Sequence, residues 1–285
     1  MRLFGAIPKS LLALAAGVVL LAGCSSIDST ASNRTHVPSA LSGLERTPLL
    51  QRLNVESPTR ASATRIIAVG FGPQNNLGDS YTTPQDDTVK WSRQVVPGRS
   101  GDWMFTSWLT GVPPPTPEVD GPNHRGYQTI QFERADVRNC ASPCLSNLWV
   151  WLDTSIPKIG DWFSLETLAL DPSTHWARVV TVNVGYEGYL SVAHVPTEFE
   201  QVMPYQSHRP FPMRRWVRLT TYIDARPGHG AVAVWQDGRL AVVSGLDGWP
   251  GGMIPQAHFG LYSPPQVVNG RVINEGLTFW TLAKP

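Results

Sequence analysis

The stretch RWVRLTTYIDARPGHGAVAVWQDGRLAVVSG, from Arg215 to Gly245, contains three runs of alternating side chains separated by turn-forming residues. In the first run, every second residue from Val217 to Ile223 is apolar or threonine, and the residues between them are aromatic or polar. A period of two is typical of a β-strand with one face in a core. The Asp-Gly pair at 237–238 favours a hairpin turn. The stretch therefore predicts three consecutive strands.

Comparable runs occur from about residue 65 to the C-terminus, and no long segment has the 3.6-residue period of a helix. The 25 prolines and 25 glycines cluster between these runs, where they favour turns. The pattern predicts further strands at residues 65–71, 127–134, 147–156, 162–170, 177–186, 188–195, 258–263 and 276–283. Eleven short strands indicate an all-β sandwich or barrel.

The first residues are predicted to be an export signal rather than part of the fold. Arg2 and Lys9 precede the apolar run from Leu11 to Leu21, which is too short to span a bilayer. The sequence Leu-Ala-Gly-Cys at 21–24 resembles the lipobox of bacterial lipoproteins. The resemblance implies that Cys24 is lipidated, for example with palmitate, and that its acyl chains anchor the mature protein to a membrane.

The residues that follow the cysteine predict a location in the cell envelope. This start is similar to that of Gram-negative lipoproteins, in which Ser25 after the cysteine implies the outer membrane. Residues 24–64 are rich in Ser, Thr, Arg and Pro, which suits a tether between a lipid and a folded domain. The chain thus divides into a signal peptide (1–23), a lipidated tether (24–64) and a β domain (65–285).

Charge and cysteine usage restrict the partners and the covalent links. A formal net charge of +1 with 16% charged residues gives no broad basic surface, which argues against nucleic acid as a partner.

In an exported chain we expect Cys140 and Cys144 to form a disulfide that closes a short loop. The two cysteines have no further clustered ligands for zinc. No cofactor is predicted, and whether the domain binds a structural calcium ion is left open.

Two predicted strands combine aromatic rings with hydrogen-bonding groups on one face. In such an arrangement a ring can stack on the C–H face of a sugar while polar groups bind its hydroxyls. We therefore predict a carbohydrate-binding surface, and the alternative is that these tryptophans fill the core between two sheets. The predicted contact residues are Trp149, Trp151, Arg218 and Tyr222 on these two strands, and Trp235 on the strand that follows.

The C-terminal part of the chain resembles a known fold family. The strand that Trp216 begins, the hairpin GAVAVWQDG (230–238), HFGLYS (258–263) and the last strand GLTFWTLAKP carry the likeness. They are similar to the second half of concanavalin A-like jelly rolls, and most similar to heparin-lyase-like polysaccharide lyases. The resemblance implies a jelly-roll β-sandwich of two antiparallel sheets for residues 65–285. It also implies that Trp235 lies in the sheet that lines a polysaccharide-binding groove.

The resemblance further implies residues for β-elimination on a uronate-containing polymer. A lyase of this kind needs a group that neutralises the carboxylate, a base and an acid, commonly Arg, Gln, His or Tyr. The candidate catalytic residues are Tyr222, Tyr262, Glu166, Gln131 and His194. On the strand equivalent to SLETLAL these lyases often carry a Gln and a His two residues apart, whereas this chain has Glu166 and Leu168.

Three functions stay open at this point. The one that we favour is a membrane-anchored envelope lipoprotein whose jelly-roll domain binds or scaffolds a polysaccharide. The second is an active polysaccharide lyase that cleaves a uronate-containing polymer. The third is a structural or interaction domain of the cell envelope whose aromatic residues belong to the core.

Replacing Cys24 by Ser removes the thiol that the lipobox would acylate, so the variant should accumulate as an unprocessed precursor and leave the membrane fraction. Cell fractionation together with labelling by a radioactive fatty acid measures both effects. Retention of the Cys24→Ser protein in the membrane fraction, without an acyl label, would show that the anchor lies elsewhere.

Overall fold

The computed structural model describes residues 63–69, 71, 82–84, 89–95, 103–111, 123–132, 140–141, 143–169, 178–197, 200–246, 248 and 252–282. The predicted signal peptide, Cys24 and nearly all of the predicted tether lie outside these residues. Every regular element of the described part is a β-strand. No helix long and apolar enough to cross a membrane is found in it.

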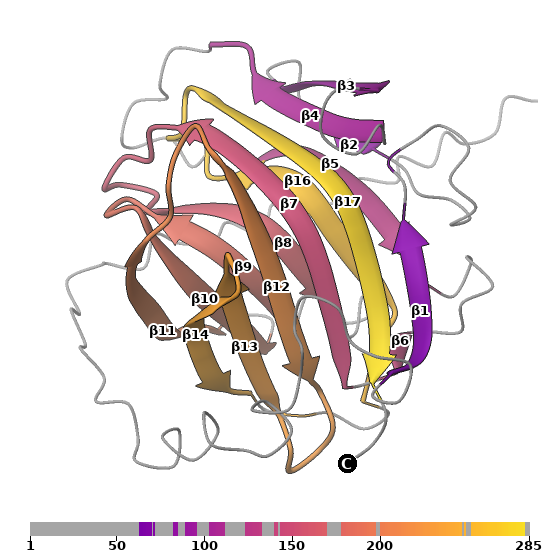
Figure 1. The fold of residues 1–285 in the computed structure, drawn as a ribbon. Helices are drawn as coiled ribbons and strands as arrows, with labels where there is room; N and C mark the ends of the chain where they lie inside the picture. Colours follow the sequence, from indigo (N-terminus) through magenta and orange to yellow (C-terminus); the bar gives the residue numbers. More distant parts are fainter. Residues whose placement is uncertain are drawn as a thin grey trace, which may run out of the picture.

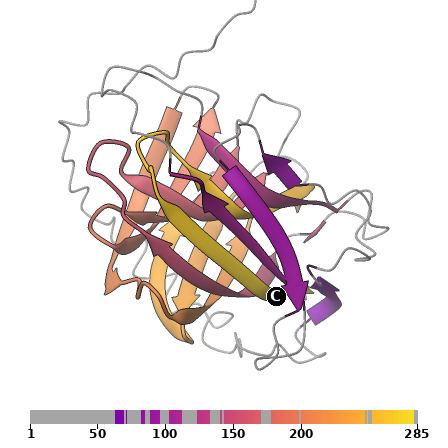
Figure 2. The same ribbon diagram turned by 90° about the horizontal axis from the view of Figure 1, so that it is seen from above.

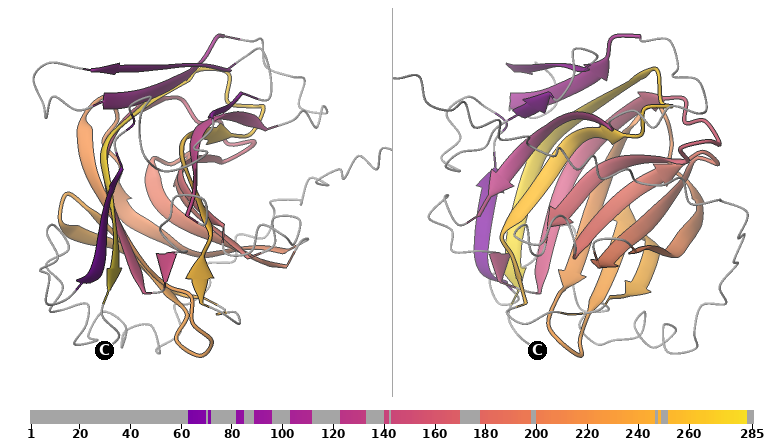
Figure 3. Two further views of the ribbon diagram at one scale, coloured as in Figure 1. Left: turned by 90° about the vertical axis from the view of Figure 1, so that its right-hand side faces the viewer. Right: turned by 180° about the vertical axis from the view of Figure 1, so that it is seen from behind.

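The strands form two large antiparallel sheets that pack face to face (Figure 1, Figure 3). The 8-stranded sheet has the order β14 (Arg239–Gly245), β13 (Ala231–Gln236), β12 (Trp216–Asp224), β7 (Cys144–Thr154), β17 (Gly270–Leu282), β4 (Trp103–Leu109), β3 (Val89–Val95), and β1 (Ala63–Val69) also pairs with β17. The 7-stranded sheet has the order β11 (Glu200–Pro210), β10 (Tyr189–Thr197), β9 (Val179–Gly185), β8 (Trp162–Ala169), β16 (Gln256–Ser263), β5 (His124–Gln131), β2 (Thr82–Pro84). The predicted all-β, jelly-roll-like sandwich of two antiparallel sheets is confirmed.

Pairs between distant parts of the chain hold both sheets together. The first described strand, β1, pairs with the last, β17, and Figure 1 shows the two side by side. Figure 2 shows the same sandwich from above. In the same sheet β7 lies between β12 and β17, and in the other sheet β16 lies between β5 and β8. A small third sheet pairs β6 (Cys140–Ala141) with β15 (Met253–Ile254).

The main core lies between the two sheets, and the alternation of side chains decides which residues enter it. Three apolar residues of β7 and three of β12 are buried there: Leu148, Val150, Leu152, Val217, Leu219 and Ile223. The 7-stranded sheet contributes further core residues, among them Phe163, Val182 and Phe259. The predicted division of these strands into a core face and an outer face is therefore confirmed.

A second apolar cluster lies on the outer face of the 8-stranded sheet. Its members are Leu145, Tyr222, Ala231, Ala233, Trp235, Val243 and Leu282, with Trp280 packed against them. Trp235 and Tyr222 are only 6% and 4% exposed. The sequence analysis expected both side chains at an open binding surface, and the structure buries them instead. The alternation of a strand selects a face but does not tell whether that face is covered.

Glu166 of β8 connects the two sheets through the core. Its Oε1 accepts a hydrogen bond of 2.7 Å from Ser146 Oγ on β7, and its Oε2 accepts one of 2.6 Å from Thr221 Oγ1 on β12. Burial raises the pKa of the Glu166 carboxyl to about 7, although both hydroxyl donors act in the opposite direction. The carboxyl therefore takes up a proton on mild acidification while it stays inside the sandwich.

Most of the strands that the sequence analysis did not predict lie at sheet edges. β2 and β11 are edge strands of the 7-stranded sheet, and β3 ends the other sheet. Edge strands carry charged residues and prolines that interrupt an apolar alternation. Lys90 in β3, Pro84 in β2 and Pro204 in β11 fit this rule. β4, which was also missed, is the neighbour of β3.

The cysteines lie where a short loop enters β7. Cys144 is disulfide-bonded and begins β7. The backbone of Cys140 belongs to β6, while its side chain lies outside the described part of the chain. The pairing of Cys140 with Cys144 therefore stays a prediction.

Replacing Trp235 by Ala should lower the free energy of unfolding by about 3–5 kcal/mol, because the ring fills a buried apolar cluster. Chemical denaturation followed by circular dichroism measures this loss. Trp103, which is 38% exposed at the start of β4, offers a matched control. We expect Trp103→Ala to change stability by no more than about 0.5 kcal/mol. An unchanged midpoint for Trp235→Ala would contradict the burial of this ring.

Glu166→Gln tests the buried carboxyl. The pKa of Glu166 is higher in the folded than in the unfolded state, so its contribution to stability is complete below pH 4.5 and is lost as the pH rises to about 7. The glutamine does not ionise, so the variant should gain stability relative to wild type between pH 5 and 8, by up to about 3 kcal/mol. Urea denaturation at both pH values measures the difference. A difference that does not vary with pH would show that the folded-state pKa is ordinary.

Candidate functional site

The predicted site residues lie in three different places: on the outer face of each large sheet and in the interior between the two sheets. The predicted carbohydrate-contact residues all lie on the outer face of the 8-stranded sheet, two of them inside the second apolar cluster. Glu166 and His194 point between the sheets, since His194 is 5% exposed and pairs with the core residue Val180. Tyr262 and Gln131 lie on the outer face of the 7-stranded sheet. Of the five candidate catalytic residues, the structure therefore brings only Tyr222 to the face of the predicted tryptophans, and it separates the other four from them.

Three indoles and a guanidinium share one end of the outer face of the 8-stranded sheet. Trp151 of β7 is paired with Trp216 of β12, and Trp149 is paired with Arg218. All four side chains are half-buried. We refer to these four residues as the tryptophan face.

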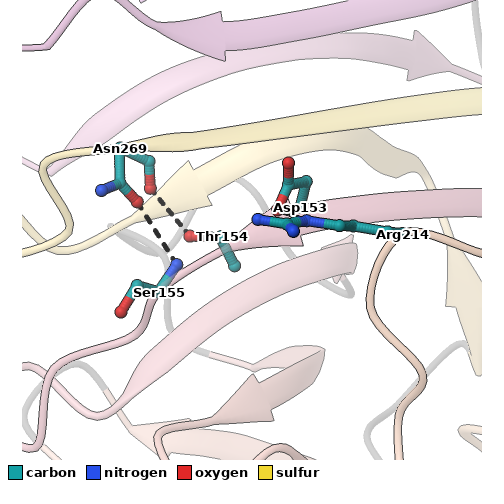
Figure 4. Close-up of polar contacts among 5 residues, drawn as sticks. All are labelled: Asp153, Thr154, Ser155, Arg214 and Asn269. Carbon is teal, nitrogen blue, oxygen red and sulfur yellow. Dashed lines mark hydrogen bonds and ion pairs between the residues drawn. The ribbon is translucent and has the colours of Figure 1, made fainter.

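Polar contacts hold the end of β7 beside this face (Figure 4). Arg214 Nε donates to Asp153 Oδ1 at 2.8 Å, and Asn269 receives hydrogen bonds from Thr154 Oγ1 at 2.8 Å and from the backbone N–H of Ser155 at 3.3 Å. The ion pair of Arg214 with Asp153 is exposed to solvent, so it contributes little to the stability of the fold. The contacts tie β7 to the segments before β12 and β17.

A different cluster of aromatic and basic side chains is centred on Tyr262 of β16. The ring of Trp162 on β8 lies 4.9 Å from the Tyr262 ring, and that of Tyr127 on β5 lies 5.9 Å from it, both in edge contacts. The guanidinium carbon of Arg125 lies 5.5 Å from the centre of the Tyr262 ring, within the range of a cation–π contact. Tyr127 stacks on His258 at 4.3 Å. We call Arg125, Tyr127, Trp162, His258 and Tyr262 the Tyr262 site.

His258 is held in its neutral form at this site. Burial lowers the pKa of the imidazole to about 3, and the charge of Arg125 acts in the same direction. The side-chain amide nitrogen of Gln256 lies 2.5 Å from His258 Nε2, which fits an amide N–H donating to a neutral ring nitrogen. At neutral pH the site therefore carries the positive charge of Arg125 without a second one from His258.

Two rows of mostly polar side chains run from the Tyr262 site across the outer face of the 7-stranded sheet. Strand pairing aligns Ser191, Asn183, Ser164, Tyr262 and Arg125 in one row, and Ala193, Thr181, Thr167, His258 and Thr129 in the other. Each row crosses five strands. Since neighbouring strands lie about 4.8 Å apart, a row is about 19 Å long.

Several polar atoms in these rows are buried without a hydrogen-bond partner. Thr129 Oγ1, Asn183 Oδ1 and Ser191 Oγ have none in the structure as far as it is described. The three residues are 0%, 1% and 1% exposed. An unmet buried polar atom costs about 1–3 kcal/mol, and a ligand that supplies hydroxyl groups would relieve this cost.

Sequence reasoning found Tyr262 but missed the other four members of the Tyr262 site. The alternation in QAHFGLYS already places His258 and Tyr262 on one face. The predicted start of the neighbouring strand at Tyr127 excluded Arg125, whereas β5 begins at His124. The pairing of β5 and β8 with β16, which brings the residues together, has no local signal in the sequence.

The side chains at the Tyr262 site are not those of a metal centre. Among the described residues, no group of three or more His, Cys, Asp or Glu side chains could hold a metal ion. The site instead offers aromatic rings, one guanidinium, an imidazole and neutral hydrogen-bonding groups. These are groups that can hold a polar, ring-shaped organic ligand.

Comparison with solved structures supports the fold assignment. No family model and no curated protein matches the chain. The chain is similar in structure to the cellulose-induced protein Cip1, with a TM-score of 0.52 and 11% sequence identity over 75% of this chain and 96% of Cip1. An identity this low shows a shared fold alone.

Receptor-binding domains of botulinum neurotoxins also match, although less well. The binding domain of neurotoxin DC in complex with rat synaptotagmin II has a TM-score of 0.47 and 9% identity over 77% of this chain and 48% of that chain. A structure of neurotoxin type C, whose cell entry depends on interaction with two ganglioside molecules, has the same score and identity over 79% of this chain and 49% of that chain. The chain spans about half the length of these domains. What the comparisons establish for this protein is its sandwich fold.

Proposed function

We propose that the protein binds a polysaccharide on the outer face of the 7-stranded sheet, centred on the Tyr262 site. The observation that carries the proposal is a cluster of half-buried rings and a half-buried guanidinium on one face, at the end of two rows of mostly polar side chains. Rings of Trp162 and Tyr262 can stack on sugar C–H faces, and Arg125 can donate hydrogen bonds to sugar oxygen atoms. The length of the polar rows suits several consecutive sugar units rather than one.

Cleavage of an acidic polysaccharide by β-elimination is a second candidate function. It is favoured by Arg125, Tyr262 and His258 standing in one site. The guanidinium can neutralise a uronate carboxylate and the phenol can donate a proton to the leaving oxygen. The neutral imidazole of His258 can accept the proton alpha to the carboxylate, although its pKa of about 3 makes it a weak base. The heparin-lyase-like resemblance of the C-terminal strands supports the same reading.

The N-terminal features support a second part of the proposal, a location in the cell envelope. We propose that a lipid on Cys24 anchors the chain to the outer membrane and that residues 24–64 act as the tether. The support is the lipobox-like sequence and the polar, proline-containing composition that follows it. A tether of this kind would let the sandwich reach a polysaccharide away from the bilayer.

Tyr262→Ala should weaken binding of a uronate polysaccharide by about 1–3 kcal/mol, or roughly 5- to 150-fold in Kd, because it removes the central ring. Titration calorimetry with defined oligosaccharides measures the affinity. Tyr186→Ala is a matched control, since Tyr186 is 40% exposed in the turn after β9. Equal affinities for Tyr262→Ala and wild type would refute the proposed site.

Tyr262→Phe separates binding from catalysis, because it keeps the ring and removes the hydroxyl. If the protein is a lyase, wild type should release products with an unsaturated sugar that absorbs in the ultraviolet, and Tyr262→Phe should lose this activity while it keeps most of its affinity. Absorbance during incubation with a panel of uronate polysaccharides measures the reaction. Binding without any absorbance change in wild type would leave binding as the function and exclude elimination on those substrates.

A further inference from the structure

The tryptophan face and the Tyr262 site belong to different sheets. The tryptophan face lies on the outer side of β7 and β12 in the 8-stranded sheet, and the Tyr262 site lies on the outer side of β5, β8 and β16 in the other. Packed sheets are about 10 Å apart, and the main core fills the space between them. A ligand bound at one of the two surfaces therefore cannot touch the other.

The tryptophan face is a compact arrangement of rings. Residues that are paired across antiparallel strands have their Cβ atoms about 4.5–5.5 Å apart, so the indoles of Trp151 and Trp216 are neighbours. Ile273 of β17 is paired with Trp151 on its other side. The three tryptophans remain half-buried, so each still offers part of its ring to solvent. This differs from Trp235, which is buried in the second apolar cluster.

A buried hydrogen-bond donor lies directly beside these rings. Asn147 precedes Trp149 by two residues on β7, so both side chains lie on the same outer face. Asn147 is 5% exposed, and its Oδ1 accepts a hydrogen bond of 2.5 Å from Thr220 Oγ1. Its Nδ2 has no hydrogen-bond partner within the described part of the chain. An oxygen atom of a ligand would satisfy this donor.

Rings, a guanidinium and an unmet amide donor together match one class of ligand. A sugar chain presents C–H faces to indoles and oxygen atoms to Asn147 and Arg218. A purely apolar partner would leave the amide donor of Asn147 unmet, which disfavours it. We propose that the tryptophan face is a second glycan-binding site, which makes the domain bivalent. Glycan binding at the tryptophan face does not depend on the Tyr262 site, whereas bivalency rests on the proposed function.

Bivalency has a consequence that can be measured. One domain with glycan sites on opposite sides can hold two segments of polysaccharide at once, and a second contact with the same polymer raises the overall avidity. Long polysaccharide should therefore be cross-linked by wild-type protein, whereas a variant with one remaining site should bind without cross-linking.

The test uses the full-length chain with hexasaccharides of galacturonate and of cellulose, and with long polygalacturonate. Titration calorimetry should give two bound hexasaccharides per wild-type chain, one for Trp151→Ala, one for Tyr262→Ala and none for the double variant. Turbidity with the long polymer should appear for wild type only. The two hexasaccharides show whether the tryptophan face prefers an acidic or a neutral chain. Trp216→Ala serves as a second variant of the face, and Trp103→Ala serves as the control.

The outcomes separate this proposal from the proposed function. Loss of one binding equivalent in Trp151→Ala and Trp216→Ala, with circular dichroism unchanged, supports the second site, even if Tyr262→Ala binds normally. A single equivalent in wild type that Trp151→Ala and Trp216→Ala leave intact overturns it, and so does the absence of binding to either hexasaccharide. Binding of wild type to anionic lipid vesicles that Trp151→Ala abolishes, without oligosaccharide binding, would assign the face to a membrane surface and also overturn it.

Discussion

The pairing of β16 with β5 on one side and β8 on the other is the constraint on which the Tyr262 site depends. Side chains alternate along each strand, so the register of these pairs decides which groups share the outer face. A slip of one residue in β16 would turn Tyr262 and His258 into the core and bring Phe259 and Leu261 to the surface. The large apolar side chains of β16 therefore keep the polar groups in place, because they cannot leave the core without a large loss of stability.

The sequence predicts individual strands of this fold better than it predicts their partners. All eleven predicted strands correspond to strands of the structure, because half-buried strands alternate visibly and turns collect Gly, Pro and Asp. The edge strands β2, β3 and β11 escaped prediction because solvent on one side removes the requirement for apolar residues. Pairs such as β7 with β17 join residues more than a hundred positions apart, and no local pattern encodes them.

Because local sequence patterns do not encode which strands pair, only part of each candidate site could be predicted. Alternation placed Trp149, Trp151 and Arg218 correctly on one face, but it could not tell that Trp235 on that face is buried in a second cluster. It also could not tell that Glu166, read as a candidate acid, crosses the core to Ser146 and Thr221. A strand in a sandwich has two faces, and assigning one to the core and one to solvent requires knowing which other elements cover each.

The pairing of β1 with β17 has a consequence for how the domain is made. The two strands come from opposite ends of the described chain, so β1 has no partner in its sheet until the last residues of β17 have emerged from the ribosome. Until then its backbone N–H and C=O groups are open to pairing with other chains. Contacts this distant in sequence also slow folding. The sheet that contains β1 can therefore be completed only after the whole domain has been synthesised, and a chaperone that covers β1 until then would protect the chain from aggregation.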